Sequence, residues 1–212
     1  MNRYTPIFLL LMLIFSMLIL PAMGAQSREQ EDALQSFREG RYSESIRITE
    51  RELARIPGNM DAYAVQGWAF LALGDWAGAV DSAQRGLDVS RYDHRILAIM
   101  SEAQYELGNN LSALQYLQDY VAVRPRGNFI DQIYLLMGEI HIRFEEYHAA
   151  DIAISTALYF EPGNAEAWER LGFVREQAGD PNYALEAYRR ALELNGNLLQ
   201  ARDAVERLSR GT

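Results

Sequence analysis

The sequence predicts an all-α solenoid of five helix–turn–helix units followed by a C-terminal capping helix. The main observation is a repeat: residues 165–198 align with the preceding stretch when shifted by 34 positions, so that Gly172 falls on Gly138. Two further observations agree, because small residues recur at fixed places and glycine or proline marks the unit boundaries. A fixed period of this length is typical of a protein that stacks one structural unit several times.

The repeated units account for most of the chain. Five units of 34 residues cover 26–59, 60–93, 94–127, 131–164 and 165–198. A three-residue insert, Asn128-Phe129-Ile130, separates the third unit from the fourth. The whole chain has 212 residues, which is enough for one short repeat array after an N-terminal segment is set aside.

Small residues occupy two positions of the repeat that lie inside predicted helices. The eighth position holds Ala33, Gly67, Ser101, Gly138 and Gly172, and the twentieth holds Ser45, Ala79, Ala113, Ala150 and Ala184. Glycine within a helix costs about 1 kcal/mol relative to alanine, so it is tolerated where two helix backbones must approach closely. We therefore interpret Gly172 as a residue of a close helix crossing and not as part of a catalytic loop.

Turn-forming residues divide the units and close several of them. Glycine marks the middle of four units, as Gly40, Gly74, Gly108 and Gly179, and proline ends three, as Pro57, Pro125 and Pro162. In the last unit Asp180 is predicted to be the N-cap and Pro181 the first helical residue, a favourable combination. The fourth unit has Glu145 and Glu146 at the turn, which we interpret as a solvated turn and not as an acid–base pair.

The residues after the fifth unit predict a capping helix and a short tail, 199–212. Apolar residues recur at helical spacing among charged ones, as Leu198, Ala201, Val205 and Leu208. One apolar and one charged face suit the end of a stack, because the last helix has a neighbour on one side alone.

The repeated unit resembles the tetratricopeptide repeat. The fifth unit carries the resemblance most fully, with Trp168, Leu171, Gly172, Ala184, Tyr188 and Ala191, and the fourth follows with Tyr134, Gly138, Ala150, Ala157 and Pro162. The first unit departs from the pattern, since Glu29, Asp32 and Glu52 occupy positions that are usually apolar or small. The resemblance implies a right-handed superhelix with a concave groove lined by the first helix of each unit.

The N-terminal residues 1–24 have the layout of a secretory signal. Arg3 precedes an apolar run from Ile7 to Leu20, and small residues at positions 22 and 24 favour a cut before Ala25. An uncleaved N-terminal anchor is the alternative, because a longer apolar stretch would come closer to the roughly 30 Å of a membrane core. Either way we expect the rest of the chain to be exported, to the periplasm or cell envelope of a bacterium.

Composition excludes several classes of partner and chemistry. The formal net charge is −9, so the chain lacks the basic face that nucleic-acid binding needs, and we expect membrane contact only through the N-terminal segment if it is uncleaved. The chain has no cysteine, which excludes disulfides, thiolate metal sites and a cysteine nucleophile. All 20 basic residues are arginine, so lysine chemistry is excluded as well.

No motif for catalysis, metal or cofactor binding is present in the sequence. The three histidines, His94, His141 and His148, show none of the spacings of known metal sites. We therefore predict a protein that is not an enzyme and that binds no cofactor.

The candidate site is the groove that the resemblance implies. Projection of the family's groove positions onto this sequence gives Phe37, Trp68, Leu71, Glu102, Tyr105, Glu106, Leu135, Glu139, Phe173 and Glu176. Trp68 is the best single anchor, because buried aromatic residues dominate interface energetics. Some of these side chains can instead pack within their own unit.

An acidic and partly aromatic groove favours an apolar partner segment flanked by arginine or lysine. The first hypothesis is a non-catalytic scaffold that binds another envelope protein or peptide segment. The alternative is an oligomeric ligand-binding or transporter-accessory protein that encloses an apolar pocket.

Overall fold

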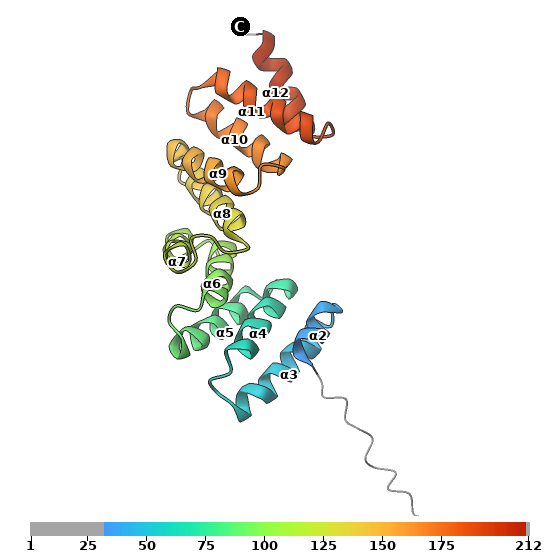
Figure 1. Ribbon diagram of the computed structural model, residues 1–212, viewed down its shortest axis with the longest axis vertical. Coiled ribbons are helices and arrows are strands. Elements are labelled where there is room, and N and C mark those ends of the chain that lie inside the picture. The colour runs from blue at the N-terminus through green and yellow to red at the C-terminus, as the bar shows by residue number, and fades with distance from the viewer. Residues whose placement is uncertain (1–31, 211–212) are drawn as a thin grey trace, which may run out of the picture. The chain divides into compact units, whose positions relative to one another are not determined.

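A computed structural model describes residues 32–210, shown in Figure 1. Within these residues the chain forms eleven α-helices and no strand. None of the described helices is long and apolar enough to cross a membrane. The predicted signal segment 1–24, the start of the first predicted unit and residues 211–212 lie outside the described residues.

The helices follow one another in pairs along the chain (Figure 1). The first helices of the pairs are α2 (Ala33–Arg38), α4 (Met60–Leu73), α6 (His94–Glu106), α8 (Ile130–Arg143) and α10 (Ala165–Gln177). The second helices are α3 (Tyr42–Arg55), α5 (Trp76–Val89), α7 (Asn110–Val123), α9 (Tyr147–Phe160) and α11 (Pro181–Leu194), and α12 (Leu199–Arg210) follows alone. The second helices start at residues 42, 76 and 110, and then at 147 and 181, so the interval is 34 except across the insert. The predicted all-α solenoid class is confirmed.

The insert differs in one detail from the sequence prediction. Ile130, which we placed in the insert, is the first residue of α8 and is only 3% exposed. It belongs to an apolar cluster with Leu117 and Ile133, so burying its side chain favours starting the helix one residue earlier. The connection between α7 and α8 therefore comprises residues 124–129.

Small residues form the centre of every helix pair. At the twentieth position all five residues, Ser45, Ala79, Ala113, Ala150 and Ala184, are 0% exposed. The hydroxyl of Ser45 donates a hydrogen bond of 2.8 Å to the carbonyl of Ala33, which satisfies the one polar group in this set. The predicted close approach of helices at these positions is confirmed.

The helical glycines also face large side chains. A Cβ atom on Gly172 would lie 2.6 Å from Cδ1 of Tyr188, and one on Gly138 would lie 2.5 Å from Cγ1 of Ile154. These contacts join the two helices of one pair. At Gly67 the neighbour is Ile99 of α6, so this glycine lets the second pair pack on the third.

The turns inside the pairs require a left-handed backbone. Four of them use the predicted glycines, Gly40, Gly74, Gly108 and Gly179, with φ between +71° and +88°. In the fourth pair Glu145 adopts the same conformation, with φ of +58°. A side chain in this region of φ crowds the backbone, whereas glycine does not.

Asp180 occupies the N-cap position of α11, but its side chain makes no capping hydrogen bond. Pro181 follows as the first helical residue, and its fixed φ starts the helix without that bond. Asp75 shows the contrast, because its carboxylate accepts from the backbone N–H of Gly78 at 2.9 Å.

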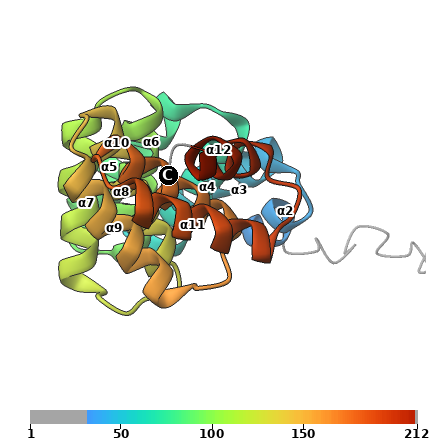
Figure 2. The same ribbon diagram turned by 90° about the horizontal axis from the view of Figure 1, so that it is seen from above.

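The helix α12 covers the apolar face of the last pair. Figure 1 and Figure 2 both show it beside α11. Ala201 and Ala204 of α12 are buried against Ala184, Tyr188 and Ala191 of α11. The small side chains allow the two helices to pack closely, so α12 shields the end of the stack from water.

We expect Gly172→Leu to destabilise the protein by about 1–3 kcal/mol or more, because the new side chain has no space beside Tyr188. Urea unfolding followed by circular dichroism measures the change. The control is Gly196→Ala in the loop before α12, where the nearest atom to a Cβ would be 3.8 Å away. Equal stability of the two variants would contradict the close crossing at Gly172.

We expect Glu145→Gly to stabilise the protein by about 0.5–1 kcal/mol. The change removes the steric strain of a side chain at positive φ, which outweighs the greater conformational entropy of glycine in the unfolded chain. Thermal and urea unfolding measure the gain. The control is Glu146→Gly, where φ is −87° and no strain is relieved. This change removes the hydrogen bond with His141, so stability should fall. A loss of stability in both variants would disprove strain at Glu145.

Candidate partner-binding surface

The first helices of consecutive pairs form one continuous surface. Contacts join α2 to α4, α4 to α6, α6 to α8 and α10 to α12. An ion pair between Glu139 and Arg170 connects α8 to α10. The predicted groove residues therefore lie on neighbouring helices, although they come from five different units.

At the N-terminal end of this surface, aromatic side chains pack against each other. The ring centroids of Phe37 and Trp68 are 6.2 Å apart, and both rings contact the cluster of Ala33, Ile48 and Val65. Trp68 is half-buried and so has a structural part, because it joins α2 to α4. The remaining exposed part of its ring is available to a partner.

Tyr105 lies at the centre of the surface, beneath an arginine of the next pair. The Arg143 guanidinium is 3.6 Å from the centroid of the Tyr105 ring, a cation–π contact. The same group donates hydrogen bonds to the carbonyl of Tyr105 at 3.2 Å and to Oδ1 of Asn110 at 3.1 Å. Burial raises the pKa of the Tyr105 hydroxyl, and the carboxylates of Glu139 and Glu106 act in the same direction.

Three carboxylates of the surface pair with an arginine from a following helix. Arg95 of α6 donates to Asp61 of α4 at 2.6 Å, and Arg170 of α10 pairs with Glu139 of α8. Sequence analysis identified Glu139 as an acidic groove residue but missed Arg170. The signal that could reveal such a partner is an arginine 31 residues downstream of the carboxylate, which a search by single positions of the repeat does not test.

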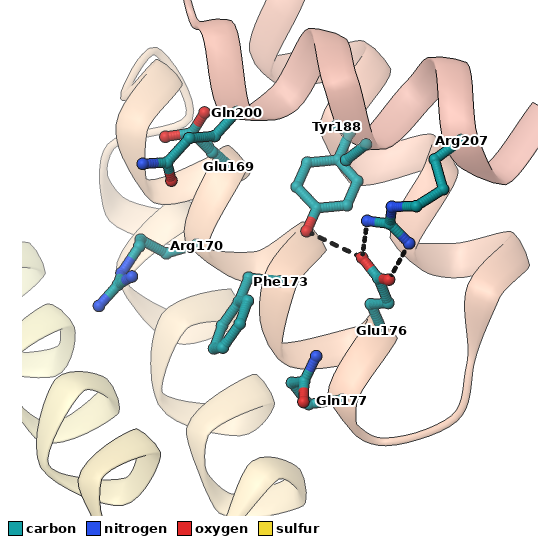
Figure 3. A pocket seen from close by; sticks show the side chains of 9 residues that line it. Glu169, Arg170, Phe173, Glu176, Gln177, Tyr188, Gln200 and Arg207 are labelled. Atoms are coloured by element: carbon teal, nitrogen blue, oxygen red, sulfur yellow. Dashed lines mark hydrogen bonds and ion pairs between the residues drawn. The ribbon is translucent and has the colours of Figure 1, made fainter.

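The same arrangement recurs at the C-terminal end, where Arg207 of α12 pairs with Glu176 (Figure 3). The second guanidinium nitrogen of Arg207 donates to Oε2 of Glu176 at 3.0 Å, and the buried hydroxyl of Tyr188 donates to the same oxygen at 3.3 Å. The hydrogen bond from Arg207 lowers the pKa of Glu176, although partial burial opposes it. Burial and the nearby Glu176 raise the pKa of the Tyr188 hydroxyl.

Glu102 and Glu106 do not take part in this pairing. They lie one helical turn apart on α6, both are exposed, and neither forms an ion pair with any described arginine. The pKa of Glu102 is raised, first by desolvation and then by the charge of Glu106. A carboxylate that solvent can reach but that protein atoms still desolvate is expected of a concave surface.

The structure places the remaining predicted residues partly in the core. Leu71 packs against the cluster around Ile99 and Met100. Leu135 and Phe173 are half-buried and pack against the cluster that contains Leu171.

Two of the shallow hollows on the described surface are lined by charged and aromatic side chains, and neither is mainly apolar. The first has a volume of about 290 Å³ and is lined by Glu169, Arg170, Phe173, Glu176, Gln177, Tyr188, Gln200, Ala204 and Arg207 (Figure 3). Its charged side chains bind other residues of the chain. Glu169, for example, accepts a hydrogen bond of 2.9 Å from the backbone N–H of Ala201 near the start of α12. The second hollow has a volume of about 400 Å³ and is lined by Trp168, Asn182, Glu186, Arg189, Arg190 and Glu193.

Residues 32–210 contain no group of three or more His, Cys, Asp or Glu side chains placed to hold a metal ion. His141 contacts Glu146 instead, with Nδ1 2.7 Å from a carboxylate oxygen. Within the same range, every buried polar side-chain atom has a hydrogen-bond partner. The chemistry of the described surface is therefore that of ion pairs and aromatic contacts.

Comparisons with known proteins agree with this architecture. A family model described as the tetratricopeptide repeat matches residues 165–198, which contain α10 and α11. Residues 165–198 are a tetratricopeptide repeat, and the described helices have the fold of tetratricopeptide-repeat solenoids. No match was found among curated proteins.

Solved structures of other repeat proteins share the fold. MamA from Desulfovibrio magneticus is 20% identical, with a TM-score of 0.71 over 79% of this chain and 93% of that one. YrrB, described as a tetratricopeptide-repeat protein with an unusual peptide-binding site, is 15% identical, with a TM-score of 0.70 over 85% of this chain and 95% of that one. At such identities the likeness shows the fold alone.

We expect Arg207→Gln to reduce stability by up to about 1 kcal/mol at neutral pH, because Glu176 loses its cationic partner. The folded-state pKa of Glu176 lies below the ordinary value of 4.5, so the pair stabilises the fold above about pH 4.5. That contribution is lost as the pH falls through the folded-state pKa. Unfolding curves of variant and wild type should therefore converge in acid.

The matched control is Arg202→Gln, which removes a hydrogen bond to the carbonyl of Gly196 and no ion pair with a carboxylate. Its effect should not follow the titration of Glu176. A difference for Arg207→Gln that persists unchanged in acid would show that the Glu176 pair is not its cause.

Proposed function

We propose that this tetratricopeptide-repeat protein is a non-catalytic scaffold that binds an apolar partner segment flanked by arginine or lysine. The observation that carries the proposal is the unneutralised pair Glu102 and Glu106 beside the half-buried ring of Tyr105. A tetratricopeptide fold is a protein-interaction module, and the first-helix surface is its continuous face.

The charge pattern supports a cationic partner at α6. Two carboxylates one turn apart repel each other, and the pKa of Glu102 is raised by desolvation first and by the charge of Glu106 second. An arginine or lysine placed between them relieves that repulsion and forms charge-assisted hydrogen bonds. The adjoining exposed parts of Trp68 and Tyr105 suit an apolar neighbour of that cation.

We propose further that the scaffold works in the cell envelope. This rests on the N-terminal sequence, with Arg3, the apolar run up to Leu20 and the small residues before Ala25. Mass spectrometry of the exported protein tests this location, because the mass shows where the mature chain begins. A chain that stays inside the cell would refute the proposed location.

Selection of peptides on the immobilised protein tests the binding proposal. We expect the recovered peptides to carry an apolar residue next to arginine or lysine. Their affinity should fall at least about tenfold with Glu102→Gln/Glu106→Gln, since each lost charged hydrogen bond removes roughly 1.5–3 kcal/mol.

The control is Glu145→Gln/Glu186→Gln, which removes the same charge from a turn and a second helix. It should bind the peptides as the wild type does. Recovery of acidic peptides, or equal binding by both double variants, would refute the proposed surface.

A further inference from the structure

The connection between α7 and α8 is the longest inter-pair loop of the described chain (Figure 1). It has six residues, 124–129, whereas the loops 56–59, 90–93, 161–164 and 195–198 have four each. Its sequence is Arg-Pro-Arg-Gly-Asn-Phe, so it combines two arginines with an aromatic residue.

The loop is held in a defined turn. The backbone N–H of Gly127 donates to the carbonyl of Arg124 at 3.2 Å, and the N–H of Ile130 donates to the carbonyl of Gly127 at 3.2 Å. A Cβ atom at Gly127 would lie 2.9 Å from the hydroxyl oxygen of Tyr120, so the turn packs on α7. Its side chains are therefore presented from a fixed backbone.

These side chains are exposed and their charge is not paired. Phe129 is 56% exposed, and both Arg124 and Arg126 are exposed without an ion pair to any described carboxylate. Arg124 acts on His94 and Tyr120, and Asp131 also acts on Tyr120, whereas Asp93 beside His94 is paired with Arg95, so the loop remains net positive. Burial and the Arg124 guanidinium both lower the pKa of His94, which favours its neutral form.

We propose that loop 124–129 of one copy docks on the Glu102/Glu106 face of α6 in a second copy of this chain. The inference rests on the proposed function, because the loop presents an exposed aromatic residue, Phe129, near two arginines. Charge complementarity selects this occupant: the described chain presents two unpaired arginines on this loop and two unpaired carboxylates on α6.

The loop does not reach the same face of its own chain. Arg124 acts on His94 at the first turn of α6, whereas Arg143, at the far end of α8, contacts Tyr105 near the last turn of α6. The helices α6 and α8 therefore run side by side in the same direction. Twelve residues separate His94 from Glu106, which is about 18 Å along the helix.

The proposed contact joins two different surfaces, so every copy both gives a loop and receives one. Such heterologous contacts build closed rings or open chains of copies, and they need not stop at a dimer. Each copy carries a net charge of −9, which opposes association at long range. Because salt screens this repulsion and the local attraction alike, charge reversal is a sharper test than ionic strength.

The test measures molar mass by sedimentation over a range of protein concentrations, with the full chain purified after export. The loop variant is Arg124→Glu/Arg126→Glu, and the face variant is Glu102→Arg/Glu106→Arg. We expect the wild type to associate as concentration rises and each variant alone to remain monomeric. An equal mixture of the two variants should associate again, because the reversed loop matches the reversed face.

The control is Arg55→Glu/Arg189→Glu, which changes net charge as the loop variant does but at exposed sites elsewhere, and it should associate like the wild type. A monomeric wild type, association of either single variant, or failure of the mixture to recover would overturn the inference. Peptide selection on α6 separates the two proposals: if the wild type is monomeric but still binds basic peptides through Glu102 and Glu106, the self-docking alone is wrong.

Discussion

The close crossing of the two helices in each pair is the constraint on which the rest of the structure depends. The residues at that crossing have no exposed surface, from Ser45 in the first pair to Ala184 in the last. Interiors are close-packed, so a larger residue there displaces a neighbour and changes the angle of the pair. The interval between successive pairs is 34 residues, and the extra residues between the third and fourth pairs lengthen their loop and add Ile130 to the start of α8.

Much of the fold was predictable because its signals are local and repeated. Gly172 is required because Tyr188 fills the space of any side chain there, and Gly179 is required because the turn has a positive φ. The exceptions were not predictable from the pattern. Glu145 adopts the left-handed conformation of glycine because the two helices of its pair fix the turn. Ile130 belongs to α8 and not to the loop because burial of its side chain favours that position.

The residues of the candidate surface were predictable from the sequence, but the pairing of their carboxylates with arginines was not. Positions of the repeat identified Glu139 and Glu176, since each faces the neighbouring first helix. Their partners, Arg170 and Arg207, come from the following helix and reach back with long side chains. Whether a carboxylate is paired depends on the distance between helices and on the rotamer of the arginine, and neither is encoded in the spacing of residues along one unit.

The distinct character of α6 follows from the same neighbour-to-neighbour logic. In α4, α8 and α10 an acidic residue receives an arginine from the next first helix. At α6 the cation that α8 supplies is Arg143, and it is committed to the ring and carbonyl of Tyr105 and to Asn110. Glu102 and Glu106 receive no arginine from α8, since Arg143 holds α6 against α8 through these other contacts. The two adjacent carboxylates of α6 thus form an acidic place without an internal cation, and the proposed preference for a cationic partner rests on that missing contact.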